Sequence, residues 1–126
     1  MADVPMQALK RRRLLVVEDD YLLADDLASW LGALGAEVVG PVGCIHDALA
    51  LIVGNGRLDG ALLDINLRGE RVFPVADALA ARRVPFVFTT GYDRVAIPPS
   101  YAAIPVCTKP TDARRLAQCL AEQLTR

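Results

Sequence analysis

The stretch Gly60-Ala61-Leu62-Leu63-Asp64, followed by Ile65-Asn66-Leu67-Arg68-Gly69-Glu70, decides the fold of this chain. A short apolar run that ends at a carboxylate indicates a buried strand with an acidic side chain at its exit. Apolar runs with polar residues directly after them recur at 14–17, 85–89 and 104–108. If these strands are parallel, their carboxyl ends share one edge of the sheet, where α/β folds bind ligands.

Helical patterns alternate with these apolar runs. The first has Leu23, Leu27, Trp30, Leu31 and Leu34 on one face and ends at Gly35. Further helices are expected at about 45–53 and 72–83, and a last one is expected after Thr111 as its N-cap. A short second strand, 37–40, should end at Pro41. Alternation of this kind predicts βαβ units and a doubly wound, five-stranded parallel sheet.

The segment between the fourth and fifth strands should lack a regular helix. It contains Pro98-Pro99, and two adjacent prolines are incompatible with a helix interior. We therefore expect a short or irregular fourth helix there.

Length and composition narrow the classes of protein. The chain has 126 residues, enough for one domain, which we place at 14–126 after a basic, unstructured leader at 1–13. A net charge of −1 gives no electrostatic basis for a nucleic-acid or membrane partner. Three cysteines without CxxC spacing indicate reduced thiols and a cytoplasmic location. The single histidine, His46, excludes histidine-based zinc chemistry and should face solvent.

Acidic residues at two of the strand ends predict a magnesium site. Mg²⁺ takes hard oxygen ligands in octahedral geometry and keeps several waters. Asp19 and Asp64 could bind the ion directly and Glu18 through water, while the backbone carbonyl of Asn66 could complete the set. The neighbouring Asp20, by contrast, is better explained as a cap of the first helix.

The other strand ends carry groups suited to a phosphoryl group. The ammonium of Lys109 could hold one phosphoryl oxygen and the hydroxyl of Thr90 could donate to another. A carboxylate such as Asp64 can itself accept a phosphoryl group and form an aspartyl-phosphate. Lysine is rare in this arginine-rich chain, which favours a role for its compact charge.

Four motifs in this order resemble the response-regulator receiver domain of two-component signalling over residues 14–124. They are Val17-Glu18-Asp19, Leu63-Asp64 with Gly69 five residues later, Thr90-Gly91 and Lys109-Pro110. The resemblance implies a flavodoxin-like fold of strand order 2-1-3-4-5. It implies that Asp64 is the phosphoacceptor, that Glu18 and Asp19 form the acidic Mg²⁺ site, and that Thr90 and Lys109 contact the phosphoryl group.

The resemblance also implies the partners. A sensor histidine kinase or a phosphotransfer protein would supply the phosphoryl group to a stand-alone bacterial receiver. The product would switch the binding of a downstream protein or pass the group along a phosphorelay. Such a protein catalyses its own phosphorylation and dephosphorylation and is not an enzyme for a separate substrate. The expected docking face runs from the fourth strand to the last helix, around Arg114, Arg115 and Gln118, and a homodimer is a further candidate assembly.

Two features depart from the family pattern. Val106 and Thr111 occupy places where aromatic residues are frequent, so we expect no aromatic rotamer switch on the fifth strand. Phe88-Thr89-Thr90-Gly91-Tyr92 is similar to a receiver subgroup whose fourth strand ends in Phe-x-Thr-Gly. The loop at 91–103 should then be the least stable part of the domain and should become ordered on activation.

Two other functions compete with this one. A haloacid-dehalogenase-type phosphatase also uses a strand-end aspartate, but it needs a second catalytic carboxylate two residues later. Asn66 stands there and cannot transfer a catalytic proton. A pseudo-receiver would share the fold and act only as an interaction module without phosphorylation. The presence of Asp64, Asp19 and Lys109 argues against this alternative, and a phosphorylation assay would separate the two.

Overall fold

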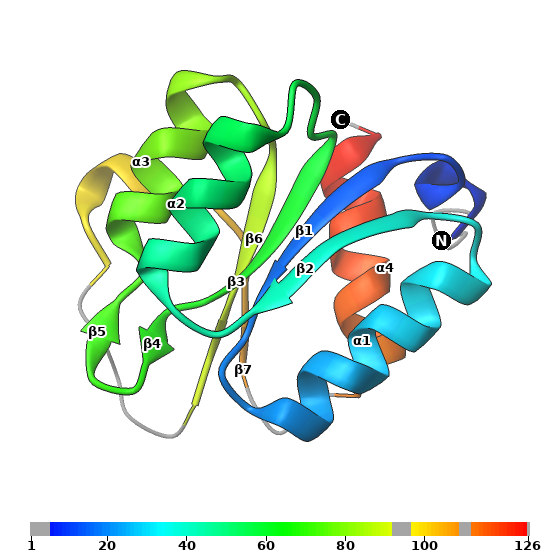
Figure 1. The fold of residues 1–126 in the computed structure, drawn as a ribbon, viewed down its shortest axis with the longest axis horizontal. Helices are drawn as coiled ribbons and strands as arrows, with labels where there is room; N and C mark the ends of the chain where they lie inside the picture. Colours follow the sequence, from blue (N-terminus) through cyan, green and yellow to red (C-terminus); the bar gives the residue numbers. More distant parts are fainter. Residues whose placement is uncertain (1–5, 92–96, 109–111, 126) are drawn as a thin grey trace.

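The computed structural model describes residues 6–91, 97–108 and 112–125 (Figure 1). A five-stranded parallel sheet has the order β2-β1-β3-β6-β7. Counting only these five strands, this is the predicted order 2-1-3-4-5. Helices α1 and α4 cover one face of the sheet, and α2 and α3 cover the other. The strands are β1 (Arg13–Val17), β2 (Glu37–Val42), β3 (Gly60–Asp64), β6 (Phe86–Thr90) and β7 (Val106–Thr108), and the helices are α1 (Tyr21–Ala33), α2 (Ile45–Gly54), α3 (Phe73–Ala81) and α4 (Ala113–Leu124).

Alternate residues of the central strands supply two separate cores. Leu63 and Phe88 belong to the core under α2 and α3, whereas Leu62 and Val87 belong to the core under α1 and α4. All five residues of β3 are buried, since this strand has neighbours on both sides and helices on both faces. A fully buried strand of this kind appears in the sequence as a continuous apolar run.

The start of the chain differs from the expected leader. A short 3-10 helix, η1 (Met6–Leu9), contacts α4, and Leu9 is fully buried in the core under α1 and α4. Strand β1 then begins at Arg13. The basic residues 10–12 therefore lie between two ordered elements, while residues 1–5 are outside the described part of the chain.

Strand β2 does not end at Pro41, as the sequence suggested, but continues to Val42. Proline is tolerated here because β2 is an edge strand, where a missing N–H need not break a ladder. The register between β1 and β2 shifts after Leu15, and Val17 then pairs with Val42. This shift brings the carbonyl of Val42 within 2.9 Å of the Glu18 amide, which donates to it.

The helix boundaries confirm the predicted patterns, with two corrections. The N-cap of α4 is Asp112, whose carboxylate accepts from the Arg115 amide at 2.8 Å, so Thr111 is not the cap. Trp30, expected on the inner face of α1, is 41% exposed. Its neighbour Leu31 takes the inward position and is fully buried. His46 faces solvent, as predicted.

The fourth helix is short, as the two prolines predict. It consists of one 3-10 turn, η2 (Pro99–Tyr101), whose Tyr101 is buried against the rings of Phe73, Phe86 and Phe88. The second half of the 91–103 segment is thus anchored to the core, whereas 92–96 lie outside the described residues. No helix in the described ranges is long and apolar enough to cross a bilayer.

Candidate functional site

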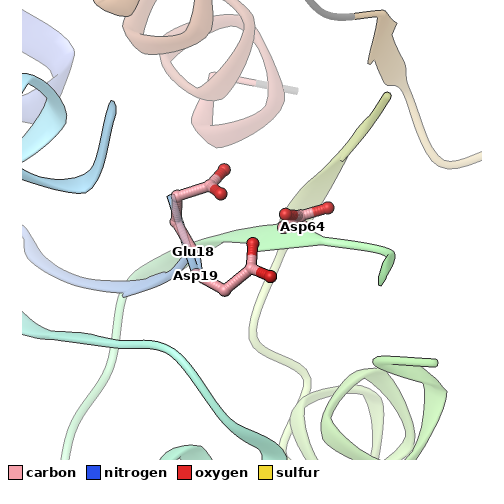
Figure 2. Close-up of side chains that lie close together, drawn as sticks. All are labelled: Glu18, Asp19 and Asp64. Carbon is pink, nitrogen blue, oxygen red and sulfur yellow. The ribbon is translucent and has the colours of Figure 1, made fainter. Parts of the chain in front are cut away.

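Three carboxylates converge at the carboxyl ends of β1 and β3. Glu18 and Asp19 follow β1 directly, and Asp64 is the last residue of β3. Each offers a carboxylate oxygen, and these oxygens lie within 4.8 Å of one another (Figure 2). The sequence predicted this convergence from the parallel strands alone, and the structure brings all three residues together.

Asp64 is held by the sheet and by the turn that follows it. The residue is 3% exposed, and its Oδ1 accepts a hydrogen bond from the Asn66 amide at 3.1 Å. Strand β3 lies between β1 and β6, so the position of this carboxylate is fixed from both sides. A buried carboxylate is stable only where donors or cations compensate the lost hydration.

Both the backbone amide and the side-chain carboxylate of Glu18 form hydrogen bonds with main-chain groups. Its amide donates to Val42 of the edge strand, and its Oε2 accepts from the Asp20 amide at 2.9 Å. Asp20 in turn caps α1, because its Oδ1 accepts from Leu22 and Leu23 at 3.0 and 3.3 Å. The capping role predicted for Asp20 is confirmed, and it aligns the start of α1 with the site.

Asp19 is positioned by a small hairpin that the sequence did not predict. Strands β4 (Asn66–Leu67) and β5 (Glu70–Arg71) pair antiparallel around a two-residue turn. Both turn residues have positive φ, 53° at Arg68 and 91° at Gly69, as a type I′ turn requires. The Arg68 amide donates to Asp19 Oδ2 at 3.0 Å. The available signal was Gly69 at a turn position between Leu67 and Glu70, a few residues after the end of β3.

The chemistry of the cluster fits a divalent cation of the Mg²⁺ type. Three carboxylates this close repel one another, and a small hard cation relieves the repulsion while taking oxygen ligands. Asn66 follows the cluster in β4, and its Oδ1 accepts from the Gly69 amide at 2.9 Å. The proposed use of the Asn66 carbonyl as a ligand stays a prediction.

The other half of the edge carries hydroxyl side chains. Thr90 is the last residue of β6 and pairs in register with Thr108, the last residue of β7. Lys109 comes next in the chain but lies outside the described residues, as do Pro110 and Thr111. Thr89 was not singled out from the sequence, yet it pairs in register with Asp64 and is 2% exposed. Its hydroxyl has no hydrogen-bond partner in the described ranges.

A hollow of about 430 Å³ adjoins the acidic cluster. Its lining includes Glu18, Asp19 and Arg68, together with Tyr21 at the start of α1 and residues 41–43 after β2. Tyr21 is 82% exposed, so the hollow is bordered by an aromatic side chain in contact with solvent. The hollow therefore borders the Glu18 and Asp19 side of the cluster.

Comparisons with known proteins agree with this architecture. SdrG of Sphingomonas melonis Fr1 has a solution structure that is 39% identical and covers 94% of this chain and 98% of its own, at a TM-score of 0.78. A BeF3-activated conformation of SdrG covers 86% of this chain and 96% of its own, at a TM-score of 0.67. A response regulator receiver protein from Sinorhizobium medicae, 20% identical, has the same fold at a TM-score of 0.75. The match covers 93% of this chain and 97% of that protein.

Among curated proteins, the sensory transduction protein LytT of Bacillus subtilis is 32% identical over 112 residues. The match covers 86% of this chain but 46% of LytT, so the chain spans less than half of that relative. No protein-family model matches. With the fold, the acidic edge and these relatives together, the chain belongs to the response-regulator receiver family of two-component signalling.

Proposed function

We propose that this receiver accepts a phosphoryl group on Asp64 in a Mg²⁺-dependent reaction. The observation that carries the proposal is the convergence of Glu18, Asp19 and Asp64 within 4.8 Å at the carboxyl edge of a receiver fold. A carboxylate oxygen of Asp64 would attack the phosphorus of a phosphohistidine. The P–N bond would break, and the donor histidine would leave with the bonding electron pair.

The residues around Asp64 have distinct parts in this proposal. Asp19 and Asp64 would hold Mg²⁺ directly and Glu18 through a water, with the Asn66 carbonyl as a further ligand. When bound, the cation would neutralise charge on the transferring phosphoryl oxygens. Lys109 and Thr90 would contact the remaining oxygens once the group is on Asp64.

The relative SdrG supports a switch driven by a phosphoryl-like group. Its BeF3-activated conformation is a solved structure, and this chain is 39% identical to SdrG. We infer that the present domain also has an activated form, in which Asp64 carries the phosphoryl group. Membership in the subgroup with the Phe-x-Thr-Gly motif, here Phe88 to Gly91, is part of the same proposal.

The partners follow from that chemistry. A sensor histidine kinase or a phosphotransfer protein would be the donor, and a downstream protein would read the face between β6 and α4. A hollow of about 280 Å³ on that face is lined by Asp112, Arg114, Arg115 and Gln118. We place the protein in the bacterial cytoplasm, as a stand-alone receiver or relay component, with no nucleic-acid or membrane partner.

Phosphorylation by acetyl phosphate and Mg²⁺ tests the proposal directly. Intact-mass spectrometry should show one phosphoryl adduct, and the adduct should be lost in alkali because it is an acyl phosphate. Asp64→Asn should abolish the adduct. Asp26→Asn is the matched control, since Asp26 is exposed on α1, outside the cluster, and it should be phosphorylated like the wild type.

Two results would contradict the proposal. One is an Asp64→Asn variant that takes up the group at the wild-type rate. The other is a wild-type protein, shown to be folded by circular dichroism, that takes up none from acetyl phosphate or from a phosphorylated histidine donor. The second result would identify the domain as a pseudo-receiver that acts by docking alone.

A further inference from the structure

Two cysteines from different elements meet on the α1 and α4 side of the sheet. Cys107 lies in β7 and Cys119 in α4, twelve residues later. Their Sγ atoms are 2.9 Å apart, and both cysteines are free thiols. Cys107 is 9% exposed within that core, and Cys119 packs against the same core from a partly exposed position. Their spacing in the sequence gives no sign of this contact.

We propose that Cys107 and Cys119 are a site of reversible oxidation, at which a hydroperoxide converts the two thiols into an intramolecular disulfide. The sulfur atoms need to approach by only about 0.9 Å to reach the usual S–S bond length of about 2.05 Å. The contact joins the middle of a three-residue strand to the middle of a helix, so the fold itself supplies the pairing. The proposal does not depend on phosphorylation.

The two thiols have unequal roles in this chemistry. Burial, and then the contact with Cys119, raise the pKa of Cys107 to about 12, so this thiol stays protonated and donates its S–H to the Cys119 sulfur. Cys119 is the more exposed of the two, and it is therefore the sulfur that an oxidant reaches first. Oxidation proceeds through the deprotonated sulfur, which is the nucleophile in such reactions.

The reaction balances in two steps. The Cys119 thiolate attacks one oxygen of the hydroperoxide ROOH, and the O–O bond breaks to give a sulfenic acid and, after protonation, ROH. The sulfur of Cys107 then attacks the sulfenic sulfur, a disulfide bond forms, and water leaves with the Cys107 proton. Two thiols are oxidised, one hydroperoxide is reduced, and a dithiol reductant reverses the change.

The disulfide would tie β7 to α4 close to the functional edge. Strand β7 ends at Thr108, one residue after Cys107, and Thr108 pairs with Thr90. The other end of the tether is in α4, on the face proposed for docking. Oxidation would thus join the strand that precedes Lys109 to the helix that borders the partner surface.

A peptide map of the full chain after treatment with hydrogen peroxide tests the proposal. The protein is reduced, freed of reductant, oxidised, alkylated and digested with trypsin without further reduction. Cleavage after the arginines gives peptides 95–114 and 116–126, because Lys109 is followed by proline and resists trypsin. The expected product is these two peptides linked, with the loss of two hydrogens. Thiol titration should fall from three to one, and dithiothreitol should restore it.

The controls separate a pairing set by the fold from random oxidation. Cys44→Ser should leave the linked peptides unchanged, because Cys44 lies at the start of α2. Cys107→Ser should leave a sulfenic acid on Cys119 that a dimedone probe traps, whereas Cys119→Ser should form no linkage. The wild-type protein unfolded in guanidinium should give mixed pairings, including Cys44.

Three results would overturn the proposal. They are unlinked peptides after peroxide treatment, a linkage that rises with protein concentration and joins two chains, and equal participation of Cys44 in the folded protein. The map of the wild type decides the matter even where a cysteine variant fails to fold, because it needs no substitution.

Discussion

The two halves of the functional edge are held in different ways. At the ends of β1 and β3, each carboxylate of the cluster accepts from a backbone amide: Glu18 from Asp20, Asp19 from Arg68 and Asp64 from Asn66. At the ends of β6 and β7 the polar groups are threonine hydroxyls, and the nearby support comes from side-chain packing around Tyr101. The carboxylates of the first half are therefore held by main-chain amides, whereas strand β6, which leads into the second half, packs against an aromatic cluster.

This difference matches the two tasks proposed for the site. Three mutually repelling carboxylates keep their places without a cation only if donors hold them, and backbone amides cannot rotate away. A half that has to respond to an added charge needs groups whose partners can change. Side-chain packing and hydroxyls provide this, since a hydroxyl both donates and accepts.

Removing one carboxylate should have the largest effect in the first half. We expect Asp19→Asn to weaken Mg²⁺ binding by at least about 10- to 100-fold, the range known for losing an outer-shell partner, because Asp19 is proposed as a direct ligand. Glu18→Gln, at the water-mediated position, should lose less. Isothermal titration calorimetry measures both. Intrinsic fluorescence of Trp30 would report Mg²⁺ binding poorly. This residue lies nine residues along α1 from Tyr21, the end of the helix nearest the cluster, and so about 14 Å from it.

Asp26→Asn, on the exposed face of α1, is the control for a general loss of negative charge. Equal Mg²⁺ affinities of Asp19→Asn and the wild type would refute the ligand role of Asp19. A larger loss with Glu18→Gln than with Asp19→Asn would exchange the two proposed positions.

The stability of the domain on the side of the second half should depend on one hydroxyl outside the edge, that of Tyr101. Tyr101 donates its hydroxyl hydrogen bond to Asp77 on α3, and its ring stacks on Phe73 with centroids 6.3 Å apart. Tyr101→Phe keeps the ring and removes the bond to a charged acceptor, so we expect unfolding to become easier by about 1.5–3 kcal/mol. Urea denaturation measures the change. A double-mutant cycle with Asp77→Asn should show coupling, and strict additivity would mean that the bond contributes nothing.

A substitution in the turn between β4 and β5 should perturb the first half of the edge less. Gly69 has φ of 91° with no atom near the position of an added Cβ, so Gly69→Ala introduces backbone strain alone. We expect a cost of about 1–2 kcal/mol and, through the Arg68 amide on Asp19, a weaker Mg²⁺ affinity. Gly56→Ala, with open space and no positive φ, is the matched control. Unchanged Mg²⁺ affinity in Gly69→Ala would show that the hairpin does not position Asp19.

The fold was predictable because each of its central strands is buried on both faces. Such strands are continuous apolar runs, so the runs at 14–17 and 60–63 located β1 and β3 without knowledge of their contacts. Edge strand β2 was cut short at Pro41, because a proline that is acceptable at an edge resembles a strand end in the sequence. The burial of Leu9 was not predictable, since a single leucine directly before the basic run 10–13 has no periodicity to indicate it.

The acidic half of the site was predictable for a similar reason. Parallel strands bring their carboxyl ends together, so the sequence positions of Asp19 and Asp64 imply their proximity. The support of the site was not predictable, because it depends on contacts between distant segments. The Arg68 amide reaches Asp19 from 49 residues away, and Tyr101 reaches Asp77 from 24 residues away. Neither contact has a local signature.

The smallest expected effect is a loss of stability in alkali that depends on Tyr101. Burial, and then the hydrogen bond to Asp77, raise the pKa of Tyr101 from 10.0 to about 12. The native state thus favours the protonated phenol, and this contribution to stability is complete below pH 10 and is lost as the pH rises from about 10 to about 12.

At about pH 10.5 the wild type should lose roughly 1 kcal/mol of its free energy of unfolding from this source, relative to Tyr101→Phe. Chemical denaturation of both proteins at neutral pH and at about pH 10.5 measures the difference, with Cys107→Ser in both backgrounds because burial also raises the pKa of the Cys107 thiol. Parallel stability profiles for the two proteins would show that the phenol titrates as it does in the unfolded chain. The aromatic cluster would then hold the second half of the edge by packing alone.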